Sequence, residues 1–215
     1  MAKRPVFIPN IDKVGYVEVE NIEFTWFPGL SIQQKQRSIS SLHLSFVTKH
    51  RNQKVLEISS KSQEELGINL SAFNLNFIYK GFKLTVESAF QSSKVFEQGG
   101  PFIDLLEKPS KDAKRDIRLK ESGKLKSFNF FDNIWELEPK TAFYDWLYIN
   151  AILQNQSLVG QLLEYTAFTD IEFNPEKSLN CQAKSAALFV ALFKTNLIKE
   201  PFFDKTDFLK MVYNI

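Results

Sequence analysis

The fold is decided by residues 73–102, FNLNFIYKGFKLTVESAFQSSKVFEQGGPF. The first part of this stretch, residues 73–86, alternates apolar and polar residues on both sides of Lys80-Gly81. That pattern predicts two strands joined by a tight turn. Thr85 then stands where the N-cap of a following helix is expected, because its hydroxyl can accept a hydrogen bond from a free backbone N–H.

The predicted helix places three polar side chains on one face. Glu87, Gln91 and Lys94 recur at i, i+4 and i+7, so a carboxylate, an amide and an ammonium would project together. The Gly-Gly-Pro of residues 99–101 is expected to end the helix, because proline cannot continue the hydrogen-bond ladder. The stripe fits a functional site, and it equally fits a solvent-exposed face with a stabilising ion pair.

The rest of the sequence predicts a mainly helical α+β fold with a small β-sheet. Residues 14–27 alternate apolar and polar residues and are expected to form strands. Ser31 is placed as the N-cap of a helix, and residues 54–60 fit a short strand. From residue 104 onward the pattern is helical nearly to the end. Apolar stripes mark three helices there, at residues 141–153, 157–168 and 180–197.

Length and composition limit the class of protein. A chain of 215 residues with 44% hydrophobic and 24% charged residues indicates a globular domain with a sizeable core. The 21 Phe against 2 Met predict a core packed through aromatic rings, with some Phe left to line a cleft for planar ligands.

The chain is expected to work in the cytoplasm. Its single cysteine, Cys181, cannot form an internal disulfide and is expected to be buried and inert. No apolar run of signal-peptide length begins the sequence, and no 18 apolar residues follow one another, so neither export nor a membrane span is expected.

No residue pattern predicts a metal or another cofactor. There is no CxxC and no Cys and His pairing with zinc spacing. His43 and His50 have no third ligand near them in the sequence and are expected to be structural or exposed.

One stretch is far more basic than the rest of the chain. The net charge of +2 is too small to indicate nucleic-acid binding. Residues 108–126, however, carry eight Lys or Arg against three acidic residues. This excess fits either a solvated helix face or a patch for a phosphate backbone or pyrophosphate. The DNA-binding candidates in it are Lys111, Lys114, Arg115 and Arg118.

Three motifs resemble one known family. Residues 70–96, LSAFNLNFIYKGFKLTVESAFQSSKVF, resemble the signature of the NADAR (YbiA-like) family, in which a Ser-containing loop and a strand pair lead into a helix of the form E-h-x-x-Q-x-x-K. Trp135 ahead of residues 141–153 resembles its Trp-led helix. Residues 168–192, FTDIEFNPEKSLNCQAKSAALFVAL, resemble its closing motif.

The chain as a whole is most similar to NADAR proteins encoded beside DarT-type toxins, which act as antitoxins. It departs from common members at Ser88, where they carry His, and after Asp170, where they carry Trp-Gly. The resemblance implies a catalytic domain at residues 61–215, with residues 1–60 as an amino-terminal extension packed on the same domain.

The resemblance implies an ADP-ribosylglycohydrolase that removes ADP-ribose from guanine bases in DNA and counteracts a DarT-type toxin. Cleavage builds positive charge on the anomeric carbon and negative charge on the leaving base, so a carboxylate and a proton donor are needed. Glu87 is expected to stabilise the carbon or activate water, and Asp170 to orient a ribose hydroxyl or Lys94. Lys94 itself would protonate the leaving base or form a Schiff base with the opened ribose.

Further residues are expected to contact the substrate, ADP-ribosylated DNA, or the product, ADP-ribose. The resemblance places some of them on the loop and the closing motif, and the two tryptophans are candidates to stack adenine or a flipped guanine. The two glycines offer backbone access to a phosphate, although a plain helix stop is the better explanation for them. These substrate-binding candidates are Ser71, Asn74, Gln91, Gly99, Gly100, Trp135, Asn180 and Trp26.

Two other functions fit the same sequence. One is an N-glycosidase acting on small nucleotides or riboflavin-pathway intermediates. The other is a non-catalytic protein that sequesters the toxin or binds ADP-ribose.

Overall fold

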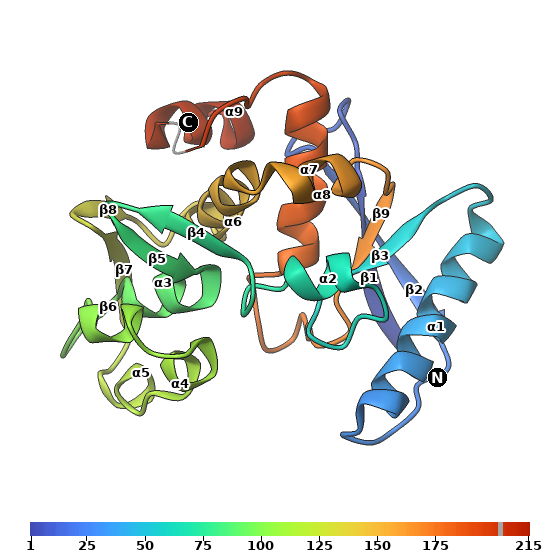
Figure 1. Cartoon of the computed structure of the whole chain (residues 1–215), viewed down its shortest axis with the longest axis horizontal. Helices are drawn as coiled ribbons and strands as arrows, with labels where there is room; N and C mark the ends of the chain where they lie inside the picture. The colour runs from blue at the N-terminus through green and yellow to red at the C-terminus, as the bar shows by residue number, and fades with distance from the viewer. Residues whose placement is uncertain (202–203) are drawn as a thin grey trace.

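The structure is a computed structural model that describes residues 1–201 and 204–215, and it has the α+β fold expected from the sequence (Figure 1). One side of the molecule holds a four-stranded sheet. The other side holds a two-stranded ribbon and a three-stranded sheet. Helices α6 (Ala142–Gln154) and α8 (Gln182–Lys194) lie between them and form much of the shared core.

The four-stranded sheet joins the start of the chain to a late strand. Its order is β2 (Val17–Phe24), β1 (Ala2–Pro9), β9 (Ala167–Thr169) and β3 (Val55–Glu57). Strand β1 is antiparallel to β2 and to β9, whereas β3 is parallel to β9. The sheet contains strands that come before residue 60 in the sequence and one that comes after it. The division of the chain into residues 1–60 and 61–215 stays a prediction.

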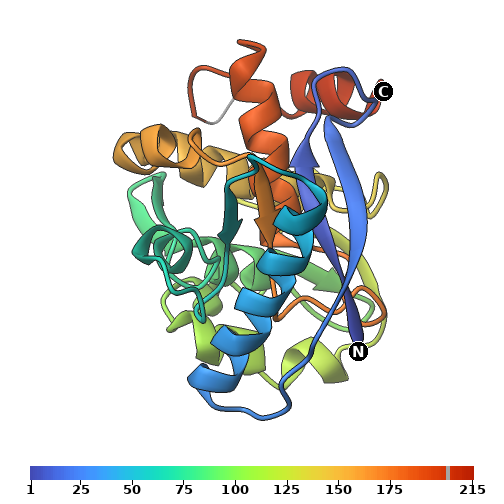
Figure 2. The ribbon, with the colours of Figure 1, turned by 90° about the vertical axis from the view of Figure 1, so that its right-hand side faces the viewer.

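Helices cover both faces of this sheet. Helix α1 (Ile32–Lys49) begins at its predicted cap, where the Ser31 hydroxyl accepts a hydrogen bond from the Gln34 N–H. Figure 2 shows α1 lying across the strands. Side chains alternate between the two faces of a strand, so Val6 packs in the cluster under α1 and Phe7 in the larger cluster that includes α8.

The segment that decides the fold forms the predicted hairpin and the start of the predicted helix. Strands β4 (Asn76–Tyr79) and β5 (Phe82–Thr85) pair through a turn in which Lys80 and Gly81 have positive φ. Helix α3 (Val86–Ser92) follows directly, with Thr85 as its N-cap. These three elements confirm the expectation for residues 73–92.

The prediction that this helix continues through Lys94 is wrong. The hydroxyls of Ser92 and Ser93 donate to the Ala89 carbonyl, and such local bonds compete with the helix ladder. The chain then turns into strand β6 (Lys94–Phe96). A distant segment therefore supplies the backbone partners that the helix would have supplied locally.

The prediction of nearly continuous helix from residue 104 is also wrong. Strand β7 (Leu125–Phe130) lies between β6 and β8 (Asn133–Trp135) in an antiparallel sheet. Its buried Phe128 and Phe130 alternate with less buried residues, the period of a half-buried strand. The segment expected as a helix over residues 157–168 ends at Leu162 and is followed by β9.

The remaining elements are mostly short helices. In chain order these are α2 (Glu65–Asn69), the 3₁₀ turn η1 (Ile103–Leu106), α4 (Ser110–Arg115), α5 (Arg118–Glu121), α7 (Gln156–Leu162) and α9 (Lys205–Tyr213). None of the helices in the described ranges has the length and apolarity that a membrane crossing requires.

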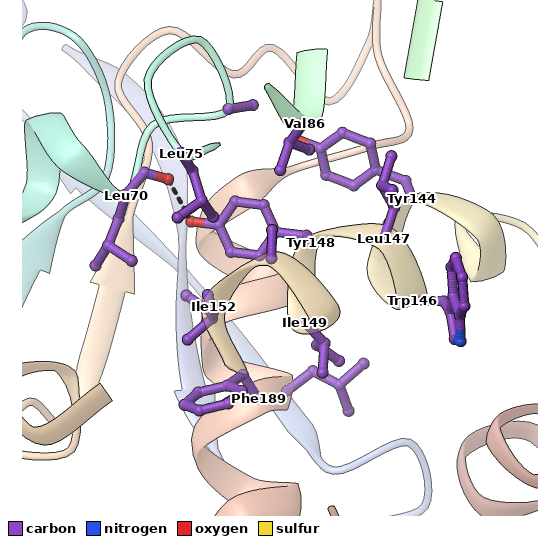
Figure 3. Packing of buried hydrophobic residues seen from close by; sticks show 14 of the residues in the cluster. Leu70, Leu75, Val86, Tyr144, Trp146, Leu147, Tyr148, Ile149, Ile152 and Phe189 are labelled. Atoms are coloured by element: carbon purple, nitrogen blue, oxygen red, sulfur yellow. Dashed lines mark hydrogen bonds between the residues drawn. The ribbon is translucent and has the colours of Figure 1, made fainter. Parts of the chain in front are cut away.

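Helix α6 is buried along nearly its whole length and anchors the core (Figure 3). Its Tyr148 hydroxyl donates to the Leu70 carbonyl at 2.6 Å, which ties the predicted loop at residue 70 to the helix. Phe143 of the same helix packs against Phe90 and Phe128, with ring centroids 6.1 and 5.0 Å away. The core is therefore packed through aromatic rings, as the composition indicated.

Candidate functional site

A cavity of about 660 Å³ opens where α3, β6 and α4 meet the loops at residues 136–141 and 170–182. Six aromatic residues of the described chain contribute to its walls, which suits planar ligands such as nucleic-acid bases. The rings that line it are those of Phe73, Phe90, Phe128, Phe143, Tyr144 and Phe173.

Helix α3 brings Glu87 and Gln91 into this cavity, and both are only 5% exposed. Gln91 Nε2 donates to Glu87 Oε1 at 2.8 Å, and Lys114 Nζ lies 3.5 Å from the same oxygen. In the described chain Gln91 Oε1 has no hydrogen-bond partner. A buried carbonyl without a donor is costly, so this oxygen is suited to accept a hydrogen bond from a bound ligand.

Lys94 reaches the same cavity from β6 rather than from the helix. Its Nζ lies 4.9 Å from the Phe90 ring centroid. Burial lowers the pKa of Lys94 to about 8, with Glu87 raising it and Lys114 lowering it further. Near neutral pH an appreciable share of this amine is therefore unprotonated, the form that can act as a nucleophile.

Asp170 reaches the cavity from a separate part of the wall, directly after β9. Its Oδ1 accepts from the Glu172 N–H at 3.0 Å. Burial, followed by repulsion from the Glu57 carboxylate, raises the pKa of Asp170 to about 8. The side chain is therefore protonated at neutral pH and has a proton to donate.

Ser88, which stands where common members carry His, has a structural task in this chain. Its backbone N–H donates to Thr85 Oγ1, and its own hydroxyl accepts from the Thr85 N–H. These reciprocal bonds form a capping box that fixes the first turn of α3 and with it the direction of Glu87.

A buried carboxylate that the sequence did not single out supports the cavity wall. Asp145 of α6 is fully buried and accepts hydrogen bonds from Thr141, Lys184 and Tyr213 at 2.6, 3.0 and 3.2 Å. Thr141 lines the cavity, so this network fixes one rim to α8 and to the last helix. The spacing of Thr and Asp at i and i+4 was the available signal, and it is too common to identify a network.

The structure brings the three expected catalytic side chains together with two of the eight substrate-binding candidates and one of the four DNA-binding candidates. Six candidates from four separate stretches of sequence line the one cavity. They are Glu87, Gln91, Lys94, Lys114, Asp170 and Asn180.

Four candidates near the loop and the glycines lie outside the lining. Ser71 is fully buried behind Ala72, and the Asn74 side chain donates to the Ile68 carbonyl. A Cβ on Gly100 would lie 2.1 Å from the Lys94 carbonyl oxygen, and its φ is +90°. A Cβ on Gly99 would lie 3.1 Å from the Phe102 ring. The two glycines let this loop pack against β6, which is a structural reason for them.

The two tryptophans are also placed away from the lining. Trp135 is 2% exposed and packs against Phe143 and Trp146, so it belongs to the core rather than to the cavity. The Lys35 Nζ lies over the Trp26 ring, 5.1 Å from the ring centroid. Lys35 forms an ion pair with Glu172 at 2.9 Å, and Glu172 lines the cavity, so Trp26 reaches the rim only indirectly.

The basic stretch divides into three parts. Lys114 faces the cavity, as described. Arg118 is held by Asp104 and Asp116 at 2.6 and 2.8 Å, which occupies its guanidinium. Lys111 and Arg115 are exposed on α4. DNA binding by these four side chains stays a prediction.

In the parts of the chain that the structure describes, no three His, Cys, Asp or Glu side chains are arranged to hold a metal ion.

The comparisons with known proteins agree with the motifs. A family model described as DarT1-associated NADAR antitoxin matches residues 2–215. No curated protein matches the chain. NADAR proteins are N-glycosidase-like hydrolases, and this group is paired with DarT toxins. Because the match spans nearly the whole sequence, the chain belongs to the DarT1-associated NADAR antitoxin family.

Proposed function

We propose that this antitoxin is an ADP-ribosylglycohydrolase that removes ADP-ribose from guanine bases in DNA and so undoes the modification made by its toxin. The observation that supports this most is the meeting of an amine with a lowered pKa, Lys94, and a carboxyl with a raised pKa, Asp170, in one aromatic cavity. A nucleophile and an acid are the groups that cleavage of a ribose–base bond requires.

Lys94 is the nucleophile in this proposal. When the ribose ring opens, the bond between its ring oxygen and the anomeric carbon breaks, the oxygen takes the proton that Lys94 loses by way of Glu87, and the carbon becomes open to the unprotonated Nζ. The nitrogen bonds to that carbon, and the guanine nitrogen leaves with the electron pair of the broken bond and a proton. Water then hydrolyses the resulting imine, which releases ADP-ribose and restores the free amine.

Glu87 has a different task from Asp170. The Lys114 ammonium lies 3.5 Å from Glu87 Oε1, and the Gln91 amide donates to the same oxygen at 2.8 Å. An ionised carboxylate can stabilise the positive charge on the sugar carbon and accept the proton that Lys94 loses.

The exposed side chains of α4 make the neighbouring surface suited to a DNA strand. Lys111 and Arg115 lie on the same short helix as Lys114, which faces the cavity. A guanine turned out of its stack would enter between the aromatic walls while the phosphates contact this basic face.

The test is release of ADP-ribose from an oligonucleotide carrying ADP-ribosylated guanine, with no metal added. Borohydride, which reduces imines, is expected to link the sugar to Lys94, and mass spectrometry of the digested protein would locate the adduct. Free ADP-ribosyl-guanosine is the matched substrate that separates DNA from small-molecule specificity. Absence of release from the oligonucleotide would overturn the proposal.

A further inference from the structure

A second buried carboxylate lies behind Asp170. Glu57 ends β3, and its register partner in the parallel strand β9 is Thr169, the residue before Asp170. Glu57 is 2% exposed and does not line the cavity, whereas Asp170 does. The sheet therefore holds two acidic side chains next to each other, one facing the cavity and one facing away from it.

Burial raises the pKa of Glu57 as well, whereas its hydrogen bonds oppose this shift and favour the ionised form. Oε1 accepts from the Ile171 N–H at 2.8 Å, and Oε2 accepts from the Thr169 hydroxyl at 2.6 Å. His43 Nε2 lies 2.8 Å from the same hydroxyl. Burial lowers the pKa of His43 to about 4, so its ring is neutral, and it donates to the oxygen of Thr169. Both carboxylate oxygens of Glu57 thus accept, and neither needs to carry a proton.

Asp170 is less well supplied with donors. Its Oδ1 receives the Glu172 N–H, and the amide of Gln182 is its further hydrogen-bond partner. Within residues 1–201 and 204–215, no lysine, arginine or histidine forms an ion pair with either Asp170 or Glu57. Two adjacent buried carboxylates without a cation cannot both ionise cheaply, so one of them keeps a proton.

The other titratable groups that face Asp170 do not relieve this repulsion. Glu172 on the same loop adds negative charge. The phenols of Tyr144 and Tyr148 on α6 and the thiol of Cys181 before α8 have raised pKa values through burial and are neutral. Glu57 is the charged neighbour with the largest influence on Asp170.

We propose that Glu57 is a positioning residue that keeps Asp170 protonated, so that Asp170 donates its proton to the guanine as the ribose–base bond breaks. This inference rests on the function proposed above. The electron pair of the broken bond goes to the guanine nitrogen, which takes the Asp170 proton. The water that hydrolyses the imine supplies the proton that restores Asp170, so the cycle is balanced.

The substitution that tests this is Glu57→Gln, which removes the charge and can retain both hydrogen bonds. The amide oxygen can accept from Ile171, and the amide nitrogen can donate to Thr169, whose hydroxyl then donates to the other tautomer of His43. Folding is therefore expected to survive. Thr169→Ser, which retains both the hydroxyl and the Glu57 charge, is the matched control.

Two measurements read the effect. Without substrate, the carboxyl carbon of Asp170 is followed by NMR against pH, with Asp170→Asn used to assign the signal. We expect a midpoint near pH 8 in the wild type and in Thr169→Ser, and one at least one pH unit lower in Glu57→Gln. With substrate, the alkaline limb of the pH–rate profile should move down by the same amount.

The outcomes separate the two proposals. An unchanged Asp170 midpoint in folded Glu57→Gln, or a wild-type midpoint near pH 4, overturns the role of Glu57. If the wild type releases no ADP-ribose, the proposed function fails, and the NMR titration alone decides whether Glu57 holds the proton on Asp170. Should Glu57→Gln not fold, the wild-type titration decides: Glu57 ionising before Asp170 supports the inference, and the reverse order overturns it.

Discussion

The two walls of the cavity treat the same functional group in opposite ways. On the α3 wall, Glu87 has an ammonium 3.5 Å away and an amide donor at 2.8 Å. On the β9 wall, Asp170 has no cation partner among the described residues and a second buried carboxylate behind it. The same functional group therefore has an ammonium and an amide donor as neighbours on one wall, and a second carboxylate on the other.

The largest expected effect is that of Lys94→Ala, which removes the proposed nucleophile. Turnover of ADP-ribosylated DNA should fall by about three orders of magnitude or more, and the borohydride adduct should disappear. Lys111→Ala, an exposed lysine outside the cavity, is the control and should retain the adduct. Near-normal turnover in Lys94→Ala would exclude Lys94 as the nucleophile.

Glu87→Gln tests the role of the carboxyl group on the α3 wall. Loss of the negative charge is expected to reduce turnover by about two to four orders of magnitude, measured as ADP-ribose release at saturating substrate. Cells that express the toxin should lose protection with this variant and with Lys94→Ala. Protection retained by both variants would indicate a protein that binds the toxin or the modified DNA without catalysis.

Asp170→Asn tests the role of the carboxyl group on the β9 wall through both the free energy of unfolding and the turnover. The raised pKa means that the folded state binds a proton more tightly than the unfolded state. The stability that this proton contributes is full below about pH 4 and is lost as the pH rises through about 8. Asparagine removes this dependence, so the variant should be more stable by roughly 1–3 kcal/mol at pH 9 while its turnover falls.

Denaturant unfolding of Asp170→Asn and wild type at pH 5 and pH 9 would measure this difference. A gain in stability at pH 9 that is absent at pH 5 fits a protonated Asp170. An equal effect at both pH values would indicate that the carboxyl is ionised throughout.

The smallest expected effect is that of Lys114→Ala at the cavity mouth. Lys114 is half-exposed beside Glu87, so its loss should weaken substrate binding by about threefold to tenfold and reduce the salt dependence of binding to modified DNA. Arg118→Ala, whose guanidinium already pairs with two aspartates, is the comparison and should alter DNA affinity less. Equal losses would place DNA along the whole basic stretch.

Local chemistry explains which parts of the fold could be predicted. The hairpin, its Lys80-Gly81 turn and the Thr85 cap depend on residues within a few positions of one another, and they form as expected. Strand β6 depends on pairing with β7, a segment distant in sequence, whereas β7 and β8 form a local hairpin in residues 125–135, which were expected to be helical. Lys94 lines the cavity from β6, although it was expected on the helix.

The site was predictable only in part for the same reason. Glu87, Lys94 and Asp170 of the family motifs lie together. Ser71 and Asn74, in contrast, hold motif positions outside the lining, and Trp135 fills the core. Glu57 and Asp145 belong to no motif, and they accept hydrogen bonds from Ile171 and Lys184, respectively, which are distant in sequence. The one available signal for Glu57 was a lone acidic residue inside the apolar segment VLEI, where burial of a charge requires an explanation.

The short strand β9 has a consequence for how this enzyme can be shortened or fused. Its three residues are bonded on one side to β1 and on the other to β3, so the position of Asp170 is held by the first 57 residues of the chain. A fragment that begins at residue 61 would retain Glu87 and Lys94 yet lose the scaffold of Asp170. A shortened variant of this antitoxin must therefore retain β1 and β3, which lie in residues 1–57.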